Sequence, residues 1–373
     1  MREKNYTDRS WVELSRENIK YNLIQIKKCL FDNEEIIAVV KANAYGHDTQ
    51  LFSKELYDLG IRHFAVACLS EAIELRKVIS DCTIIILAYT PYNQANELVK
   101  YNLCQTITSY EYLDNLYKYS DDLINVHIAI DTGMSRIGLS SKDLNKSFEY
   151  IDKAFSLYNV LGMFTHLTSA DDDSKEADDI TSTQIERFKP FLKRYSDSIK
   201  FTHFKNSSAI FRRLDNLSNY ARCGITLYGL YPASEMEKYI DLKEVLSWYT
   251  VVSSVRDVKK GEAVGYNSLF VAPCDMRVAS VACGYSDGYR REMTNKAHVL
   301  VNGKIAKQIG RICMDQFMID VTGIEDVSIG SKVVLIGKDG DLEIKASDLA
   351  SIANTNHYDI LSNISKRVDR KIV

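Results

Sequence analysis

The chain has 373 residues, of which 46% are hydrophobic and 26% are charged, and its net charge at pH 7 is -3. This length exceeds what one hydrophobic core usually supports, so we expect two domains. The near balance of charge excludes a strongly basic surface for nucleic acid, and the longest apolar runs are too short to span a bilayer. We therefore expect a globular protein that binds neither nucleic acid nor membranes.

The cysteines and the first residues indicate the cellular compartment. The eight cysteines show neither CxxC pairs nor metal-ligand spacing, and several lie in apolar runs. We expect reduced thiols in the core and no metal site. The charged start at Met1–Lys4 is not followed by an apolar segment, which predicts no secretory signal. Both observations favour a cytoplasmic protein.

The first predicted elements are a helix and a buried strand. Ser15 is a suitable helix cap, and apolar residues recur at helical spacing from Ile19 to Leu30. The segment Glu35–Val40 is apolar after its first residue, which predicts a strand buried on both faces. Lys41 stands where this strand ends. It is either a lysine that reaches water from a strand end or an amine used in chemistry, since burial lowers its pKa.

Strands and helices then alternate. A second helix is expected to end at Gly60, and later helices to begin at the cap residues Ser70, Ser109 and Ser140. Further strands are predicted at 63–67, 83–88, 105–108, 125–130, 160–165, 200–204 and 220–225. With the lysine strand they make eight strand-helix units, as a parallel (β/α)8 barrel of the TIM type requires. We assign an α/β fold with this barrel at residues 14–240, and an open doubly wound sheet is the alternative.

A different pattern begins near Leu246. β-branched segments at 251–258, 276–282 and 333–336 are separated by turns instead of helices. The dipeptide Asn302-Gly303 between two apolar runs predicts a β-hairpin. We expect a mostly β C-terminal domain at 241–373. The extended segment Arg9–Glu13 suggests that residues 1–13 pair with it, and the acidic run Asp171–Asp173 is expected to be a solvated loop.

Polar residues gather where the predicted barrel strands end, which is where barrel enzymes build their active sites. They are Lys41, Tyr45 and His47 at strand one, Asp131, Ser135 and Arg136 at strand five, His166 at strand six, Asn206, Ser207 and Ser208 at strand seven, and Arg222 and Gly224 at strand eight. Barrels commonly bind phosphate beside their last two strands, through backbone N–H groups. A phosphate site and a reactive lysine together suggest pyridoxal phosphate.

Several motifs, in order along the chain, resemble those of the alanine racemases. They are AVVKANAYGH (38–47), DTGMSRIG (131–138), FTHL (164–167), NSSA (206–209), ARCGITLYG (221–229), GEAVGY (261–266), GYSDGYRR (284–291) and GRICMDQ (310–316). Alanine racemases are pyridoxal-phosphate enzymes with a barrel followed by a β domain. The likeness covers nearly the whole chain, and motifs that recur in this order are highly specific.

The resemblance implies a two-base racemase. Lys41 would bind the cofactor and act as one proton base, while Tyr266 would act as the other from the partner subunit of a head-to-tail homodimer. Two bases are needed because inversion removes a proton from one face of Cα and delivers one to the opposite face. Arg222 would face the pyridine nitrogen and suppress transamination, since an arginine does not give up its proton.

The resemblance assigns the remaining site residues to the cofactor and the substrate. The cofactor would be held by Tyr45, His166, Asn206, Ser207, Gly224, Ile225 and Tyr358. The substrate, alanine, would meet Arg136 and the backbone around Met314, while Tyr285 and Asp315 would line the entrance. His203 matches no family ligand, and we assign no chemistry to His47.

Two departures and several alternatives remain. Many family members carry a modified lysine where this chain has Ala129, so Arg136 needs another partner, either an anion or Asn125. Asn267-Ser268 stands where glycine is usual. The leading hypothesis is an alanine racemase that supplies D-alanine for peptidoglycan. The alternatives are a related serine racemase, which has asparagine where Tyr358 stands, a non-catalytic pyridoxal-phosphate homeostasis protein, and a decarboxylase of this fold.

Overall fold

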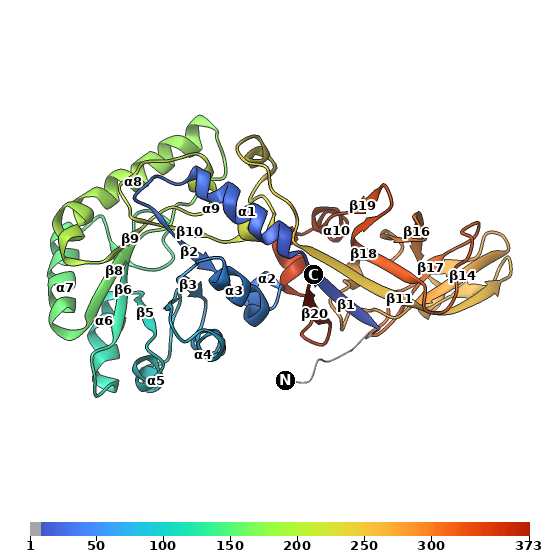
Figure 1. Cartoon of the computed structure of the whole chain (residues 1–373), viewed down its shortest axis with the longest axis horizontal. Helices are drawn as coiled ribbons and strands as arrows, with labels where there is room; N and C mark the ends of the chain where they lie inside the picture. The colour runs from blue at the N-terminus through green and yellow to red at the C-terminus, as the bar shows by residue number, and fades with distance from the viewer. Residues whose placement is uncertain (1–8) are drawn as a thin grey trace. The chain divides into compact units, whose positions relative to one another are not determined.

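The structure is a computed structural model that describes residues 9–373. These residues form two compact units, which we name the barrel unit and the strand unit (Figure 1). The barrel unit contains residues 17–44 and 49–244, and the strand unit contains residues 9–16, 45–48 and 245–373. Of the segment 1–13 that we expected to pair with the C-terminal domain, residues 1–8 lie outside the described part.

The barrel unit is built on eight parallel strands in the order β10-β2-β3-β4-β5-β6-β8-β9. They are β2 (Glu35–Val39), β3 (His63–Val66), β4 (Thr83–Ile86), β5 (Cys104–Ile107), β6 (Asn125–Asp131), β8 (Asn159–Phe164), β9 (Phe201–His203) and β10 (Tyr220–Cys223). The strands that come first and last along the chain, β2 and β10, pair with each other, with Tyr220 opposite Glu35 and Cys223 opposite Ala38. An open sheet would leave these two strands apart, so the predicted barrel, here nearly closed, is confirmed.

Helices surround the barrel strands (Figure 1). They are α1 (Arg16–Cys29), α3 (Thr49–Asp58), α4 (Leu69–Val78), α5 (Ala95–Lys100), α6 (Tyr110–Leu116), α7 (Leu144–Leu157), α8 (Lys175–Tyr195) and α9 (Ser207–Phe211). Because they cover the outer face of the sheet while side chains fill its interior, the strands are apolar on both faces. The burial of every residue from Ile36 to Val39 follows from this arrangement.

One of the three predicted serine caps of the later helices is confirmed, and two are wrong. The Ser109 side chain accepts a hydrogen bond from the backbone N–H of Tyr112 at the start of α6. Ser70 lies inside α4, because the buried Leu69 is the first residue of that helix and Cys68 its cap, two residues before the predicted one. Ser140 instead belongs to the short strand β7 (Leu139–Ser140), and Asp143 caps α7.

The strand unit contains a nine-stranded sheet in the order β19-β18-β15-β16-β17-β14-β11-β1-β20. Its strands are β1 (Ser10–Leu14), β11 (Leu246–Val258), β14 (Met276–Val281), β15 (His298–Val301), β16 (Lys304–Ile309), β17 (Phe317–Asp320), β18 (Lys332–Asp339), β19 (Leu342–Ile344) and β20 (Asp369–Ile372). The N-terminal strand β1 runs antiparallel to β11, with Val12 opposite Trp248. The Asn302-Gly303 hairpin is confirmed, since both residues have positive φ angles (50° and 68°) between β15 and β16.

The strand unit also holds features that the sequence pattern did not indicate. Two helices, α10 (Ala346–Ala353) and α11 (His357–Ser362), precede its last strand. A two-stranded ribbon, β12 (Ala263–Val264) with β13 (Phe270–Val271), lies outside the main sheet. The expectation of core cysteines holds for Cys104, Cys223 and Cys283, while four others are only half-buried. It fails at Cys274, which is exposed because it lies in a bend between strands.

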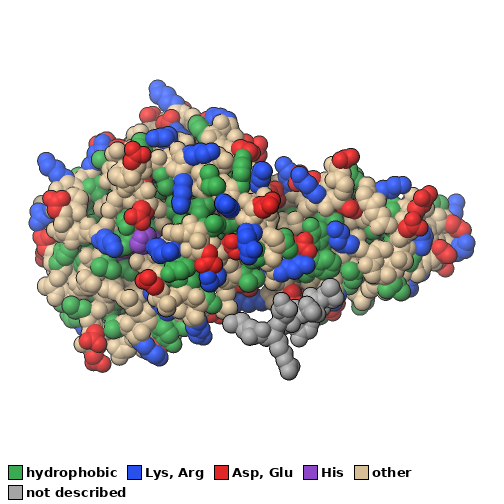
Figure 2. All heavy atoms as spheres, viewed as in Figure 1, with side chains coloured by type: hydrophobic (Ala, Val, Ile, Leu, Met, Phe, Trp, Pro, Cys, Tyr) green, Lys and Arg blue, Asp and Glu red, His purple; other side chains and the backbone are tan. Residues whose placement is uncertain are grey.

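The distribution of charge on the surface agrees with the nearly balanced charge of the sequence. Basic and acidic side chains are interspersed over the visible face (Figure 2). Residues 171–173 are exposed, as expected for a solvated loop. Among residues 9–373, no helix is both long and apolar enough to cross a membrane. The same residues bring together no group of three or more His, Cys, Asp or Glu side chains that could hold a metal ion.

Candidate active site

Lys41 lies just beyond the carboxyl end of β2. Its amine is partly buried there and lies near the charged side chains of Arg136 and Glu71. Burial lowers the pKa of the amine, and the positive charge of Arg136 lowers it further. The negative charge of Glu71 opposes these two effects. A lysine whose pKa is lowered in this way has a larger neutral, nucleophilic fraction near pH 7.

The chain after Lys41 makes a left-handed turn. Ala42, Asn43 and Ala44 all have φ and ψ angles near +50° within the segment α2 (Lys41–Tyr45). This conformation costs roughly 1–2 kcal/mol per residue that is not glycine. Part of the cost is offset by hydrogen bonds from the N–H of Ala44 to the carbonyl of Val40 (3.0 Å) and from the N–H of Thr49 to Oδ1 of Asn43 (3.1 Å). Such strain is typical of functional sites.

Arg222 on β10 is buried at the centre of a polar network. One of its terminal nitrogens donates to the carbonyl of Thr165 (2.8 Å) and meets Nδ1 of His166 (3.1 Å), and the other meets Nδ1 of His203 (2.6 Å). Burial and the charge of Arg136 lower the pKa of Arg222 to about 9. Burial and the nearby arginines lower the pKa of His166 to about 3, so this imidazole is neutral at pH 7.

The network extends to a histidine that the sequence interpretation did not single out. Nδ1 of His127 lies 2.9 Å from Nε2 of His203, and both rings are fully buried. His203, to which the family resemblance assigns no role, therefore connects Arg222 to His127. The sequence shows a histidine in each of two apolar strand segments. Sequence alone does not distinguish such histidines from ordinary core residues.

Four of the residues expected to hold the cofactor follow β9 and β10, namely Asn206, Ser207, Gly224 and Ile225. Oγ of Ser207 accepts hydrogen bonds from the N–H of Gly224 (3.1 Å) and from the hydroxyl of Thr226 (3.2 Å). The side chain of Asn206 caps α9 by accepting from the N–H of Ala209 (3.0 Å). Ile225 follows Gly224 and begins a short 3-10 helix.

Arg136 and His166 line a small cavity of about 20 Å³ together with Ala129. The suggestion that Asn125 orients Arg136 is wrong. Asn125 begins β6, where it bonds the side chains of Asn102 (2.9 Å) and Asn159 (2.7 Å), whereas Arg136 follows the other end of that strand. At about 3.3 Å per residue, a strand of this length separates its two ends by roughly 20 Å.

In the strand unit, four expected residues line one pocket of about 730 Å³. They are Tyr266, Tyr285, Met314 and Asp315. Tyr266 is 65% exposed. The next two residues, Asn267 and Ser268, have φ angles of 59° and 51°, which explains why glycine suits these positions.

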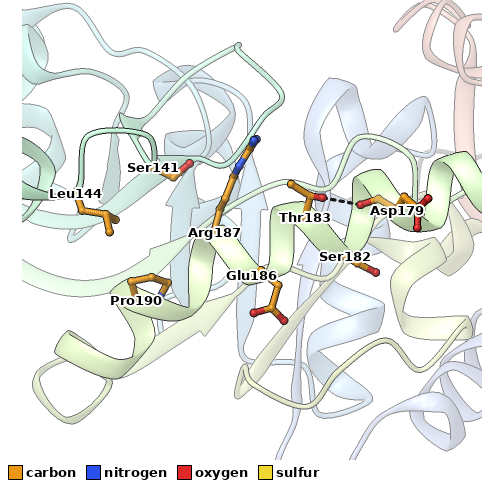
Figure 3. Close-up of a pocket in the computed structure, with 8 residues that line it drawn as sticks. All are labelled: Ser141, Leu144, Asp179, Ser182, Thr183, Glu186, Arg187 and Pro190. Atoms are coloured by element: carbon orange, nitrogen blue, oxygen red, sulfur yellow. Dashed lines mark hydrogen bonds between the residues drawn. The ribbon is translucent and has the colours of Figure 1, made fainter.

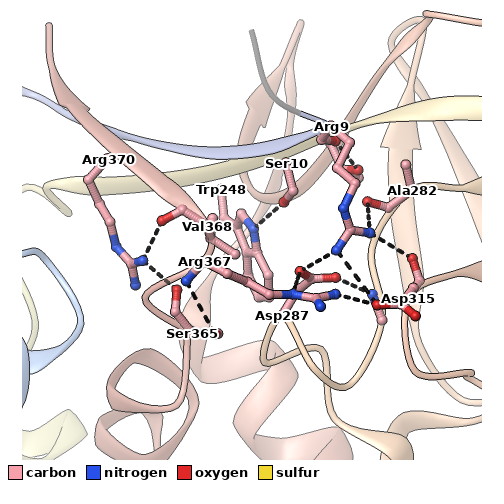
Figure 4. A network of polar contacts seen from close by, with 12 residues as sticks. Arg9, Ser10, Trp248, Ala282, Asp287, Asp315, Ser365, Arg367, Val368 and Arg370 are labelled. Atoms are coloured by element: carbon pink, nitrogen blue, oxygen red, sulfur yellow. Dashed lines mark hydrogen bonds and ion pairs between the residues drawn. The ribbon is translucent and has the colours of Figure 1, made fainter. Parts of the chain in front are cut away.

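Two arginines fix the loops that carry Asp315 and Asp287 (Figure 4). The buried carboxylate of Asp287 accepts hydrogen bonds from Arg9 (2.8 Å) and Arg367 (2.7 Å). Arg367 also donates to the carboxylate of Asp315 (2.6 Å), and Arg9 donates to its backbone carbonyl (2.9 Å). The carboxylates of Asp287 and Asp315 raise the pKa of Arg367, so it remains charged.

Tyr45 and Tyr358 also lie together in the strand unit. Their ring centroids are 5.9 Å apart, with the planes tilted by 55°. The backbone after Tyr45 packs tightly on α11, because a Cβ on Gly46 would lie 2.0 Å from the carbonyl oxygen of Leu361. Glycine is therefore required at this position.

Family comparison agrees with both units. The family model described as "Alanine racemase, N-terminal domain" matches residues 14–232, and "Alanine racemase, C-terminal domain" matches residues 245–372. The chain belongs to the alanine racemase family. This confirms the family, the fold class and the isomerase activity that the motifs implied.

Individual alanine racemases resemble the chain over nearly its whole length. "Alanine racemase 1" of Clostridium acetobutylicum is 38% identical, and the match covers 96% of this chain and 94% of that protein. An alanine racemase of Clostridium perfringens is 39% identical over the same shares of the two chains. The crystal structure of the Bacillus anthracis alanine racemase with bound L-Ala-P superposes with a TM-score of 0.91 at 33% identity, covering 99% of this chain and 96% of that one.

A groove of the barrel unit lies apart from the alanine racemase motifs. It runs along α8, has a volume of about 640 Å³, and is lined by Ser141, Leu144, Asp179, Ser182, Thr183, Glu186, Arg187 and Pro190 (Figure 3). None of the expected site residues lines it. The candidate active site of the barrel unit is the cluster of Lys41, Arg136, His166 and Arg222. The strand unit separately holds the pocket that Tyr266 lines.

Proposed function

We propose that the protein interconverts L-alanine and D-alanine with pyridoxal phosphate, by a two-base mechanism, and so supplies D-alanine for peptidoglycan. The observation that carries this proposal is the position of Lys41. Its amine, with a pKa lowered by burial, shares one cluster with Arg136, His166 and Arg222. We also propose that the enzyme acts in the cytoplasm, since all eight of its cysteines are free thiols.

The residues of the barrel unit fit pyridoxal phosphate. Both terminal nitrogens of Arg222 are engaged by His203, Thr165 and His166, and its Nε donates to no acceptor among residues 9–373. Such a donor, on a side chain that is otherwise buried, suits the pyridine nitrogen of the cofactor. Ser207 and Gly224, already in contact, would bind the phosphate together with Ile225, and Asn206 would also contact the cofactor. Tyr45 and Tyr358, which belong to the strand unit, are proposed as further phosphate ligands.

The chain's own groups would move the two protons. When bound, the cofactor withdraws electrons from the amino acid and so acidifies its Cα–H bond. Nζ of Lys41 would exchange a proton on one face of Cα, and Oη of Tyr266 would exchange one on the other. Arg222 would stay protonated and keep the pyridine nitrogen unprotonated, because even its lowered pKa of about 9 lies above neutral pH.

A homodimer would complete this arrangement. Tyr266 is 65% exposed within its own chain, and an active-site base needs a surface that excludes water. We propose that each protomer supplies Tyr266, Tyr285, Met314 and Asp315 to the barrel of the other. The domain at 14–240 would then bind the cofactor, and the domain at 241–373 would supply the second base.

Absorbance and turnover test the proposal. Purified protein with pyridoxal phosphate is expected to show the absorbance band of the covalently bound cofactor, which Lys41→Ala should abolish and the exposed control Lys142→Ala should leave intact. Tyr266→Phe should keep the band and lose most racemisation, whereas Tyr119→Phe should keep both. A spectrum unchanged by Lys41→Ala would refute the cofactor assignment. A normal band without turnover in the unmodified protein would favour the non-catalytic alternative.

Substrate choice needs its own assay. L-alanine is expected to turn over faster than L-serine, because Tyr358 leaves little room for a hydroxymethyl group. If serine were faster by tenfold or more in kcat/KM, which is about 1.4 kcal/mol in transition-state stabilisation, the substrate assignment would be overturned.

A further inference from the structure

The carboxylate of Glu71 bridges two loops at the mouth of the barrel. Oε1 accepts a hydrogen bond from the N–H of Ala42 (2.7 Å), the residue after Lys41. Oε2 accepts one from the N–H of Ala67 (2.8 Å), which follows β3. Glu71 itself lies in the first turn of α4 and is only partly exposed.

We propose that Glu71 is a positioning residue, whose two hydrogen bonds hold the left-handed turn after Lys41 in place and so fix the direction of the lysine side chain. This inference rests on the proposed role of Lys41. It deepens that role by naming the residue that holds the catalytic lysine in place. That residue, Glu71, lies outside all of the alanine racemase motifs.

The bridge lies where regular strand pairing stops. The last ladder bond between β2 and β3 runs from the N–H of Val40 to the carbonyl of Ala65 (2.8 Å). The carbonyl of Val40 then accepts from the N–H of Ala44 inside the left-handed turn (3.0 Å), so it is engaged away from β3. The N–H groups of Ala42 and Ala67 both turn to Glu71 instead of to a neighbouring strand. Glu71 therefore replaces the ladder at the point where Lys41 leaves it.

The turn needs such support. Ala42, Asn43 and Ala44 have a strained conformation without the freedom of glycine. Such conformations persist only where the surroundings determine them. The bond from Ala42 lies at the first residue of the turn, so its loss would release the backbone directly beside Lys41.

A carboxylate is the group that this geometry requires. Two N–H donors meet two separate oxygens, and a glutamine can offer only one oxygen, because its NH₂ group would face the second N–H. The charge matters as well, since Glu71 is an anion whose field acts on the Lys41 amine against that of Arg136. Glu71→Gln should therefore remove one hydrogen bond and the charge while changing the side-chain volume very little.

A purely local role for Glu71 has to be separated from positioning. Acidic residues in the first turn of a helix stabilise its N-terminus. Glu111 has this place in α6, and its carboxylate accepts no hydrogen bond from any residue between 9 and 373. Glu111→Gln is therefore the matched control for the helix-terminus effect.

The test compares Glu71→Gln, Glu71→Asp and Glu111→Gln with the unmodified protein. In the cofactor-free protein, hydrogen exchange of the peptide around Ala42 should be at least tenfold faster in both Glu71 variants, with peptides from β5 and β6 unchanged as a fold check. The pH dependence of Lys41 acylation should shift to lower pH in Glu71→Gln and much less in Glu71→Asp, which keeps the charge but not the reach. In the holoenzyme, kcat for L-alanine should fall at least tenfold in both Glu71 variants, with a smaller change in KM.

The outcomes separate this inference from the proposed function. The positioning role would be overturned if Glu71→Gln left the hydrogen exchange around Ala42 unchanged. It would also be overturned if Glu111→Gln accelerated this exchange as much as Glu71→Gln does. If the unmodified protein neither binds pyridoxal phosphate nor turns over alanine, the proposed function fails. The exchange and acylation results would still decide whether Glu71 fixes the turn.

Discussion

Nζ of Lys205 lies 2.6 Å from Oε1 of Glu34, and neither side chain is exposed to solvent. The contact is electrostatic rather than a well-aligned hydrogen bond, and the ring of Phe31 supports the ammonium group at 4.3 Å from its centroid. The backbone carbonyl of Lys205 accepts from the N–H of Arg222 (3.1 Å), so the pair adjoins the candidate site.

Removing one partner of this pair should be costly. Lys205→Met would leave the buried Glu34 carboxylate without its cation, and we expect the free energy of unfolding in urea to fall by about 3–5 kcal/mol. The exposed pair of Lys238 with Asp173 provides the control, since Lys238→Met should lower the free energy of unfolding far less than Lys205→Met does. Adding Glu34→Leu to Lys205→Met should recover much of the loss. Equal costs for the two lysines would contradict the expected cost of an unpaired buried charge.

The buried histidines should make stability depend on pH. Burial lowers the pKa of His127 to about 3, and burial with the charge of Arg222 lowers that of His203 well below its usual value. In the unfolded chain both protonate near pH 6.5. Between that pH and about 3 the unfolded state binds more protons, so stability should fall as the pH falls, by up to about 1.4 kcal/mol per pH unit for each histidine.

Urea titrations between pH 6.5 and 5 would measure this slope before most carboxylates protonate. His127→Gln should flatten the slope by the share of one histidine, whereas a replacement of the partly exposed His298 should change it little. A free energy of unfolding that stays constant across this window would contradict the neutral state assigned to both rings.

Gly229 should tolerate no side chain. Its φ is +81°, and a Cβ would lie 1.8 Å from the carbonyl oxygen of Lys243. Gly60, in the same unit, has a φ of +97° but nothing within 4 Å of the added Cβ. Gly60→Ala should therefore cost about 1 kcal/mol for the backbone alone, and Gly229→Ala should cost about 1–3 kcal/mol more. If the two variants unfold at the same urea concentration, close packing at Gly229 is refuted.

The strands were the most predictable part of the fold. Each barrel strand is a short apolar run, because both faces of a parallel barrel strand are covered, and runs such as Glu35–Val40 carry that signature in their own composition. Helix starts were less predictable. Ser70 and Ser140 are acceptable caps in isolation, but the buried side chain of Leu69 and the pairing of β7 decide where the helices begin.

The motifs located individual site residues, but not what supports them. The left-handed turn after Lys41 contains no glycine before Gly46, so no turn signature marked it. Glu71 can bridge the two loops only because β2 and β3 bring the N–H groups of Ala42 and Ala67 within reach of one carboxylate. His203 likewise meets Arg222 only because the barrel brings β9 near β10. Such contacts depend on the arrangement of strands far apart in the sequence, and no local pattern encodes them.

Tyr358 should restrict the size of the substrate side chain. Its ring lies beside those of Tyr45 (5.9 Å between centroids) and His357 (4.8 Å), so its own position is constrained. Tyr358→Asn would remove the ring and open space of the kind that a hydroxymethyl group needs. Because one added or missing group in a pocket is worth about 1–3 kcal/mol, the serine-to-alanine ratio of kcat/KM should rise by about tenfold or more. Tyr119→Asn, which removes an exposed ring, should leave the ratio unchanged. A ratio that is equally unaffected by Tyr358→Asn would mean that another side chain selects alanine.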